Sequence, residues 1–156
     1  MRPTLDWLLV AIQALLFVGI GLWPTSLGPP APAMRELGGV IFVVGGVGML
    51  VAARDLGRAL TPVPAPNGAG LRTRGLFRWI RHPMYTAVLT VSSGVACARG
   101  SWVVWAFVFA LGVFFEGKTR REESYLFAAY DGYADYAAAT GKFLPGVAKR
   151  RKLARH

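Results

Sequence analysis

Four long apolar runs dominate the chain. They span residues 5–23, 37–53, 84–98 and 101–115. Within each run the apolar residues are nearly continuous rather than alternating with polar ones. The first run is interrupted only by Asp6 and Gln13, and the second contains no charged residue. A bilayer core of about 30 Å requires roughly 17–25 helical residues, so the first two runs are each long enough to cross it as a helix.

The last two runs are shorter, at 15 residues each, and only Arg99 and Gly100 separate them. They reach spanning length if the third extends back to His82 and the fourth continues past Glu116. The two-residue separation predicts a tight helical hairpin. We therefore predict an all-α protein with about four transmembrane helices.

A soluble helical bundle is the main alternative to this interpretation. Hydrophobic residues make up 54% of the chain and the mean hydropathy is +0.41. Helices in a soluble bundle need a polar face toward water, and a chain of 156 residues cannot supply enough polar surface to cover four helices that are apolar all round. The composition thus indicates an integral, multi-pass membrane protein. We expect the first run to be a retained helix rather than a cleaved signal, because Asp6 opposes the weak positive charge before it.

The polar segments between and after the runs predict further elements. Three prolines stiffen residues 61–66, and residues 67–70 have the composition of a turn. Residues 116–136 mix charged and aromatic residues in a pattern typical of a helix that continues the fourth run into the cytosol, and a short helix is expected at 133–139, before Gly141. We expect two transmembrane helices in residues 1–53, and in residues 54–156 the hairpin followed by cytosolic helices.

Small residues are concentrated in the second run. Gly45, Gly46 and Gly48 lie within an apolar span without a preceding strand, so they do not form a nucleotide-binding fingerprint. Close packing against a neighbouring helix, for instance through the Gly48 and Ala52 spacing, is the better interpretation.

The net charge of +10 is distributed unevenly along the chain. Sixteen of the 18 basic residues fall at the N-terminus, in residues 54–81 or in residues 118–155, and only Arg35 and Arg99 fall on the other side of the predicted membrane. The positive-inside rule then predicts that both termini and the central loop are cytoplasmic. Topology accounts for most of this charge, so we expect no nucleic-acid partner. The basic run at residues 149–152 is expected to contact anionic lipid headgroups.

Polar residues gather at the predicted cytoplasmic ends of the last two runs. The candidates are Arg72, Arg74, Arg81, His82, Tyr85, Glu122, Glu123 and Tyr136. They offer cations, two carboxylates, an imidazole and phenols, without a plausible set of metal ligands or a hydrolytic triad. This mixture suits a ligand that carries a carboxylate together with hydroxyl or amino groups, and it suits a lipid headgroup equally well. Taken singly, most of these residues could instead be lipid anchors, surface ion pairs or interfacial aromatics.

The order of these motifs resembles a known family. The stretch at residues 71–85, which ends Arg81-His82-Pro83-Met84-Tyr85, is followed by Arg121-Glu122-Glu123 and then by Tyr133-x-x-Tyr136. This pattern, over residues 54–146, resembles the isoprenylcysteine carboxyl methyltransferases, which belong to a wider group with the membrane phospholipid methyltransferases. The chain departs from the family at Leu76-Phe77, where Pro-Tyr is common, and at Ala129-Tyr130, where Phe-Gly is usual.

The resemblance implies a catalytic region at residues 54–156 that binds S-adenosylmethionine and takes a lipophilic acceptor from the bilayer. By position, five residues fall on the family's cofactor and active-site motifs, namely Arg81, His82, Tyr85, Glu122 and Glu123. From this we infer catalytic roles for Arg81, Glu123 and Tyr136. We infer a cofactor site made of Arg74, His82, Tyr85, Glu122 and Glu123. The acceptor stays open between an isoprenylcysteine-like carboxylate, a phospholipid amine and a thiol. Two alternatives stand beside this reading: a non-catalytic membrane protein that binds lipid or a partner through its basic face, and an NADPH-dependent membrane reductase.

Overall fold

The computed structural model describes residues 3–24, 31–61 and 70–149. Within these ranges the chain is helical, with no strand. The elements are α1 (Pro3–Leu22), α2 (Pro32–Leu56), η1 (Gly57–Ala59), η2 (Gly75–Arg78), α3 (Pro83–Arg99), α4 (Trp102–Ala129) and α5 (Tyr133–Ala139). The predicted helix positions are confirmed, including the extension of the fourth run to Ala129 and the short helix before Gly141. The expectations for residues 62–69 and 150–152 lie outside the described residues.

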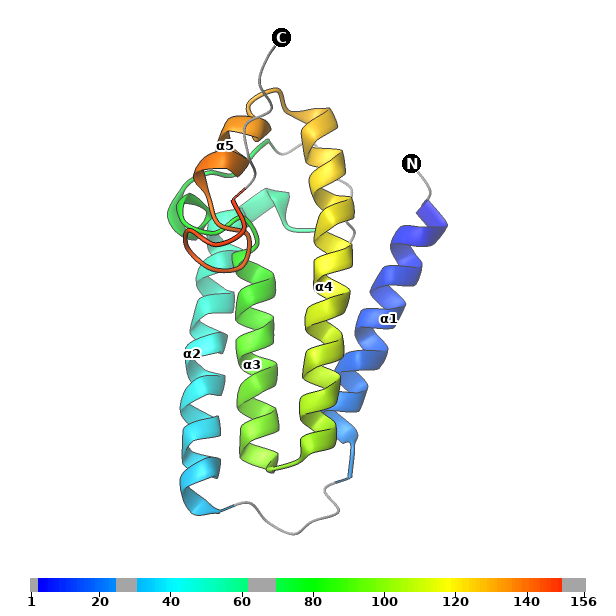
Figure 1. Ribbon diagram of the computed structural model, residues 1–156, viewed down its shortest axis with the longest axis vertical. Helices are drawn as coiled ribbons and strands as arrows, with labels where there is room; N and C mark the ends of the chain where they lie inside the picture. Colours follow the sequence, from blue (N-terminus) through cyan, green and yellow to red (C-terminus); the bar gives the residue numbers. More distant parts are fainter. Residues whose placement is uncertain (1–2, 25–30, 62–69, 150–156) are drawn as a thin grey trace.

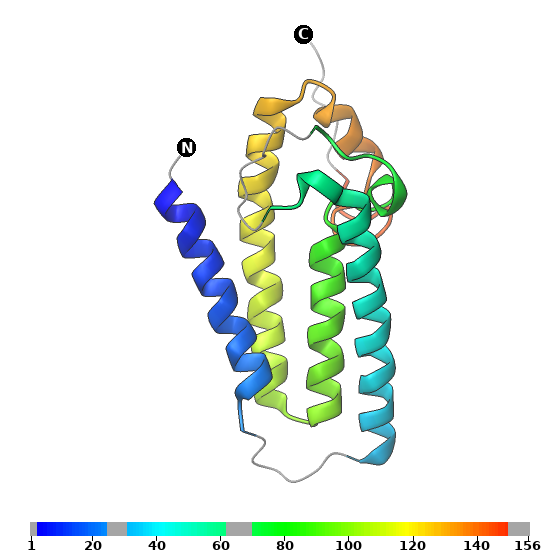
Figure 2. The same cartoon turned by 180° about the vertical axis from the view of Figure 1, so that it is seen from behind.

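The four long helices run up and down in one elongated bundle (Figure 1). α2, α3 and α4 lie side by side, and α1 leans against the outer side of α4, as the reverse view also shows (Figure 2). The first turn of α1, the end of α4 and all of α5 lie at the same end of the bundle. The polar motifs are therefore collected at one end, which we refer to as the capped end.

α2 and α3 pack closest because glycines line their contact. A Cβ added to Gly45 would lie 2.6 Å from the backbone nitrogen of Val91, and one added to Gly94 would lie 2.5 Å from that of Phe42. Close packing of the glycine-rich helix is thus confirmed, and Ala52 is fully buried. Its tightest points are Gly45 and Gly94, whereas Gly48 has only an ordinary contact with Ala87, at 3.6 Å.

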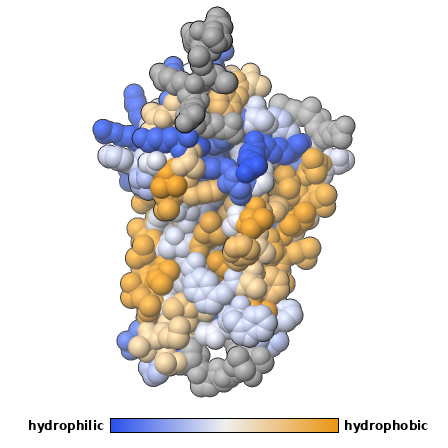
Figure 3. Space-filling view, in the orientation of Figure 1, coloured by the Kyte–Doolittle hydropathy of each residue, from blue (hydrophilic) through white to orange (hydrophobic). Residues whose placement is uncertain are grey.

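The exposed surface of the bundle is largely apolar. Leu15, Leu50 and Phe109 are 70–75% exposed, and hydrophobic side chains cover much of the face shown in Figure 3 below the hydrophilic capped end. Apolar patches of this extent are unstable in water and indicate a lipid-facing surface. Three of the described helices, α1, α2 and α4, are long and apolar enough to cross a membrane. α3 has 17 residues, so its role as the fourth span stays a prediction.

The ends of α3 follow from its sequence. Pro83 occupies the first turn, where its missing N–H leaves no hydrogen bond unmade. Gly100 ends the helix in the left-handed conformation, with φ of 60°, and its N–H donates to the carbonyls of Ala96 and Cys97. Ser101 then precedes α4 directly. This is the predicted tight hairpin between the third and fourth runs.

Candidate active site

The first motif is held at the capped end by the segment that follows α5. The N–H of Arg81 donates to the carbonyl of Gly141 at 2.8 Å, and the N–H of His82 donates to that of Lys142 at 3.1 Å. The Thr86 hydroxyl donates to the carbonyl of Phe143 at 2.7 Å. These bonds fasten the C-terminal segment over the start of α3, so residues some sixty positions apart in sequence share one site.

Arg81 is buried and its guanidinium is engaged on every side. Its Nε donates to the carboxylate of Glu123 at 2.8 Å, in an ion pair whose two side chains are each 1% exposed. Its Nη1 donates to the carbonyls of Ala137 and Thr140, and its Nη2 donates to that of Ala148 at 3.1 Å. One arginine thus joins α3, α4, α5 and the C-terminal segment. This geometry favours a positioning role for Arg81 over a catalytic one.

His82 lies just before α3, with its ring between the two adjacent carboxylates of α4. Its Nε2 is 3.2 Å from Oε1 of Glu123, and its Nδ1 is 3.8 Å from Oε2 of Glu122. The ring makes no capping hydrogen bond to the N-terminus of α3. Its place at the helix N-terminus is as expected, and its contacts are with α4.

The two carboxylates of α4 have different surroundings. Glu123 is 1% exposed and is held by Arg81 and His82. The Glu122 side chain is 28% exposed and accepts a hydrogen bond from the Tyr85 hydroxyl at 3.1 Å. Neighbouring helical residues point about 100° apart, so only one of the pair can face a given cavity. That residue is Glu122.

The tyrosines of α5 complete the wall above Glu122. The Tyr136 hydroxyl donates to the carbonyl of Phe77 at 2.6 Å. Burial raises the pKa of Tyr136 to about 12, and the Arg81 guanidinium opposes part of that rise. Burial, and then the Glu123 carboxylate, raise the pKa of the Tyr133 hydroxyl. Both phenols therefore stay protonated and uncharged near neutral pH.

Two cavities meet at this point. The outer cavity lies under α5 and encloses about 570 Å³ of empty space, including the part open to solvent; Gly70, Arg72, Leu126, Tyr130, Tyr133 and Tyr136 contribute to its lining. The inner cavity continues into the bundle and encloses about 1100 Å³ on the same measure; Val10, Gln13, Met84, Tyr85, Val88 and Lys118 contribute to its lining.

The two cavities share six lining residues, namely Leu56, Ala59, Thr61, Phe77, Arg81 and Glu122. The inner cavity extends from the shared wall toward the apolar part of the bundle, between α1, α3 and α4. A ligand in one cavity would therefore face a ligand in the other across Glu122.

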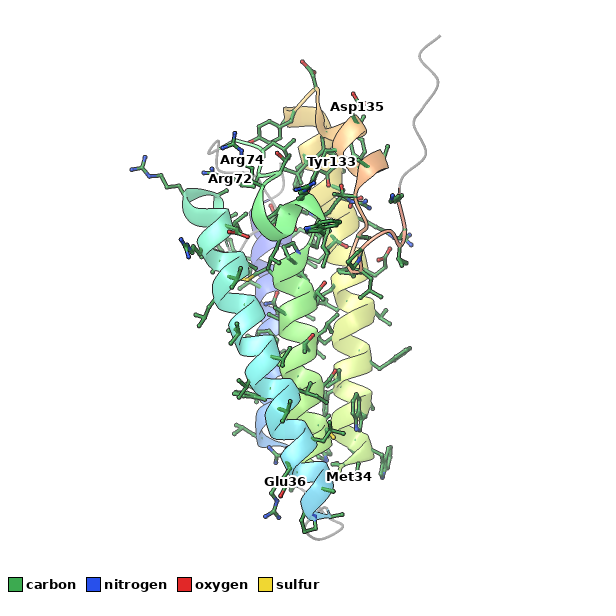
Figure 4. All side chains as sticks on the ribbon, turned by 90° about the vertical axis from the view of Figure 1, so that its left-hand side faces the viewer. Met34, Glu36, Arg72, Arg74, Tyr133 and Asp135 are labelled. Carbon is green, nitrogen blue, oxygen red and sulfur yellow. The ribbon has the colours of Figure 1, made fainter. Side chains whose placement is uncertain are left out.

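The two candidate arginines before η2 lie differently. Arg72 lines the outer cavity, and its buried Nε has no hydrogen-bond partner among the residues that the structure describes. Arg74 is exposed and is not part of that lining. Both lie at the capped end, with Tyr133 (Figure 4). The structure thus brings together all the sequence-predicted site residues except Arg74.

Two polar contacts between α1 and α4, one in the inner cavity and one outside its lining, were not predicted from the sequence. Gln13 accepts a hydrogen bond from the Lys118 ammonium at 2.7 Å, and Asp6 accepts one from Nε of Arg121 at 2.9 Å. Arg121 therefore faces α1, although its neighbours Glu122 and Glu123 face the site. A signal was present: Asp6 and Gln13 are the two polar interruptions of the first apolar run, and polar groups in a membrane helix require partners.

The described residues contain no cluster of three or more His, Cys, Asp or Glu side chains that could hold a metal ion.

The chain departs from the family pattern at two places, and a residue from each place, Phe77 and Tyr130, lines the outer cavity.

Comparisons with known proteins agree with this geometry. An uncharacterized protein of Schizosaccharomyces pombe is 34% identical over 85 residues, which cover 50% of this chain and 24% of that protein. The solved structure of a eukaryotic intramembrane Ras methyltransferase, isoprenylcysteine carboxyl methyltransferase, is similar in fold, with a TM-score of 0.68 and 20% identity over 96% of this chain and 52% of that one. The chain thus spans about a quarter of the curated relative and about half of the solved structure.

A family model places the chain more firmly. The model described as phospholipid methyltransferase matches residues 34–132. That range includes α2, α3 and α4 and every predicted site residue except Tyr136. The resemblance read from the sequence motifs is confirmed, and the chain belongs to the phospholipid methyltransferase family.

Proposed function

We propose that this protein is a membrane methyltransferase that uses S-adenosylmethionine to methylate a lipophilic acceptor. The observation that carries the proposal is the junction of the two cavities at Arg81 and Glu122. A polar ligand can enter the outer cavity at the capped end, while an apolar one can reach the inner cavity from between the helices. Methyl transfer requires such a meeting of a charged donor and its acceptor.

The residues of the outer cavity fit the donor. S-adenosylmethionine, when bound, would supply a methyl group activated by a positively charged sulfur: an acceptor lone pair would form the new bond to the methyl carbon while the carbon–sulfur bond breaks and its electron pair returns to sulfur. Arg72 would bind its carboxylate, because the buried Nε lacks a partner among the described residues. Glu122 would accept hydrogen bonds from its amino group or ribose hydroxyls. The rings of Tyr133 and Tyr136 would cover it.

The other site residues would hold this arrangement in place. Arg81 fixes α5 over α4 through the Glu123 carboxylate and three carbonyls. His82 bridges the two carboxylates, and Tyr85 holds Glu122 toward the shared wall. Displacement at an activated methyl group needs mainly alignment and exclusion of water, which these contacts supply.

Several expectations become part of the proposal. Residues 54–156 would carry catalysis, α3 would be the fourth span, and both termini would be cytoplasmic. The acceptor would enter from the bilayer, while anionic lipid headgroups would contact the basic capped end. Isoprenylcysteine-like carboxylates, phospholipid amines and thiols are the acceptor classes to compare.

Transfer of a labelled methyl group tests the proposal. Purified protein is incubated with methyl-tritiated S-adenosylmethionine and a total lipid extract of its host membranes, and organic-soluble label is counted. We expect incorporation by the wild type, and a decrease of about tenfold or more for Glu122→Gln, because a charge-assisted hydrogen bond is lost. Incorporation that is equal in both proteins would contradict the role of Glu122.

The two arginines before η2 provide a matched pair. Arg72→Met should weaken binding of S-adenosylhomocysteine about tenfold or more, because a cation facing the ligand carboxylate is lost. Arg74→Met should leave the affinity unchanged, since Arg74 is exposed outside the cavity lining. Calorimetric titration of both variants measures the difference. A larger loss in the Arg74 variant would reverse this assignment.

A further inference from the structure

Lys118 is a buried cation in the inner cavity that the proposed chemistry leaves unused. Lys118 is 3% exposed, although it lies in α4, where Phe109 and Val113 are largely exposed. It precedes Glu122 by one helical turn and lines the inner cavity with that residue. Lys118 therefore lies between the shared wall and the apolar part of the bundle.

α1 holds this ammonium in place. The side-chain oxygen of Gln13 accepts its hydrogen bond at 2.7 Å, and the Tyr85 ring centroid lies 5.5 Å from Nζ. The ion pair of Asp6 with Arg121 fixes the same two helices about two turns of α1 away. α1 lies outside the range of the family match, which begins at residue 34.

The charges around the junction favour one kind of acceptor. Arg81 and Glu123 form a pair, and Lys118 and Glu122 carry opposite charges. S-adenosylmethionine would add one net positive charge, because its amino and carboxylate groups cancel and its sulfonium remains. An ammonium acceptor would meet like charge, whereas an anionic group would be neutralised.

We propose that Lys118, held by Gln13, selects the acceptor by binding an anionic oxygen of its head, either a carboxylate or a phosphate. This inference rests on the proposed function. The acceptor's chain would lie among the apolar residues of the inner cavity, with its charged head at Lys118. Lys118 is thus a specificity-determining residue rather than a catalytic one.

Binding of matched amphiphiles tests this inference. The detergent-purified protein, saturated with S-adenosylhomocysteine, is titrated with dodecanoate, dodecyl phosphate, dodecan-1-ol and dodecylamine. We expect at least one anion to bind about tenfold or more tightly than the alcohol. The anion that binds more tightly identifies the carboxylate or the phosphate as the source.

The variants separate charge recognition from structure. Lys118→Met should lose the preference for the anion, Lys118→Arg should keep it, and Gln13→Leu should weaken it. Arg120→Met removes a charge from an exposed position of the same helix and should change nothing. If Lys118→Met keeps the preference, or if the amine binds best, the inference is overturned. Absence of S-adenosylhomocysteine binding in the wild type would instead defeat the proposed function itself.

Discussion

Replacement of Arg81 by alanine is expected to lower the free energy of unfolding by about 3–5 kcal/mol, because it leaves a buried carboxylate without its partner. Glu123 is 1% exposed, and its 3.2 Å contact with Nε2 of His82 would not replace the guanidinium. The carbonyls of Ala137 and Ala148 would lose their donor as well. The segment over the outer cavity would then detach from α4, and binding of S-adenosylhomocysteine would be lost.

Thermal unfolding in detergent and calorimetric titration measure the two effects. Arg78→Ala is the matched control, since Arg78 is an exposed arginine three positions earlier whose guanidinium lies 5.2 Å from the centroid of the Trp79 ring. It should resemble the wild type in both measurements. Wild-type stability in Arg81→Ala would contradict the positioning role given to Arg81.

A second large effect is expected where α2 and α3 approach each other. Gly45→Leu should destabilise the protein by about 3 kcal/mol or more, because overpacking a tight contact forces its surroundings to move. A Cβ at this position would lie 2.6 Å from the backbone nitrogen of Val91 and 3.1 Å from the carbonyl oxygen of Ala87. Backbone atoms cannot rotate away, so the two helices would have to separate.

The adjacent glycine is the control for this substitution. A Cβ added to Gly46 meets nothing within 4 Å, so Gly46→Leu should fold as the wild type does. Both variants are compared by thermal unfolding and by size-exclusion chromatography in the same detergent. Equal stability of the two variants would show that the glycine contact does not hold the helices together.

The helices could be predicted from the sequence because each apolar run has to be hydrogen-bonded within itself in a membrane. Pro83 and Gly100 then set the ends of α3. Which helices pack closest was harder to predict from the sequence. The small residues near Gly48 indicated a contact, but its tightest points at Gly45 and Gly94 depend on the crossing of α2 and α3.

The sequence predicted which residues form the site better than it predicted which of their side chains face the cavity. Helical geometry requires that Glu122 and Glu123 diverge, yet it does not say which one faces the cavity, because the rotation of α4 is set by packing. The choice between Arg72 and Arg74 depends on an irregular segment before η2, which has no periodicity to read. Lys118 was missed because its partner Gln13 lies in a helix distant in sequence.

Calorimetric titration of the purified, folded protein with S-adenosylhomocysteine, with NADPH as the control ligand, tests the central claim most directly. The account predicts saturable binding of S-adenosylhomocysteine at one site, binding about tenfold or more weaker in Arg72→Met, and no binding of NADPH. Binding of NADPH alone would favour a reductase. Binding of neither ligand by folded protein would contradict a methyltransferase and leave a non-catalytic membrane protein as the better description.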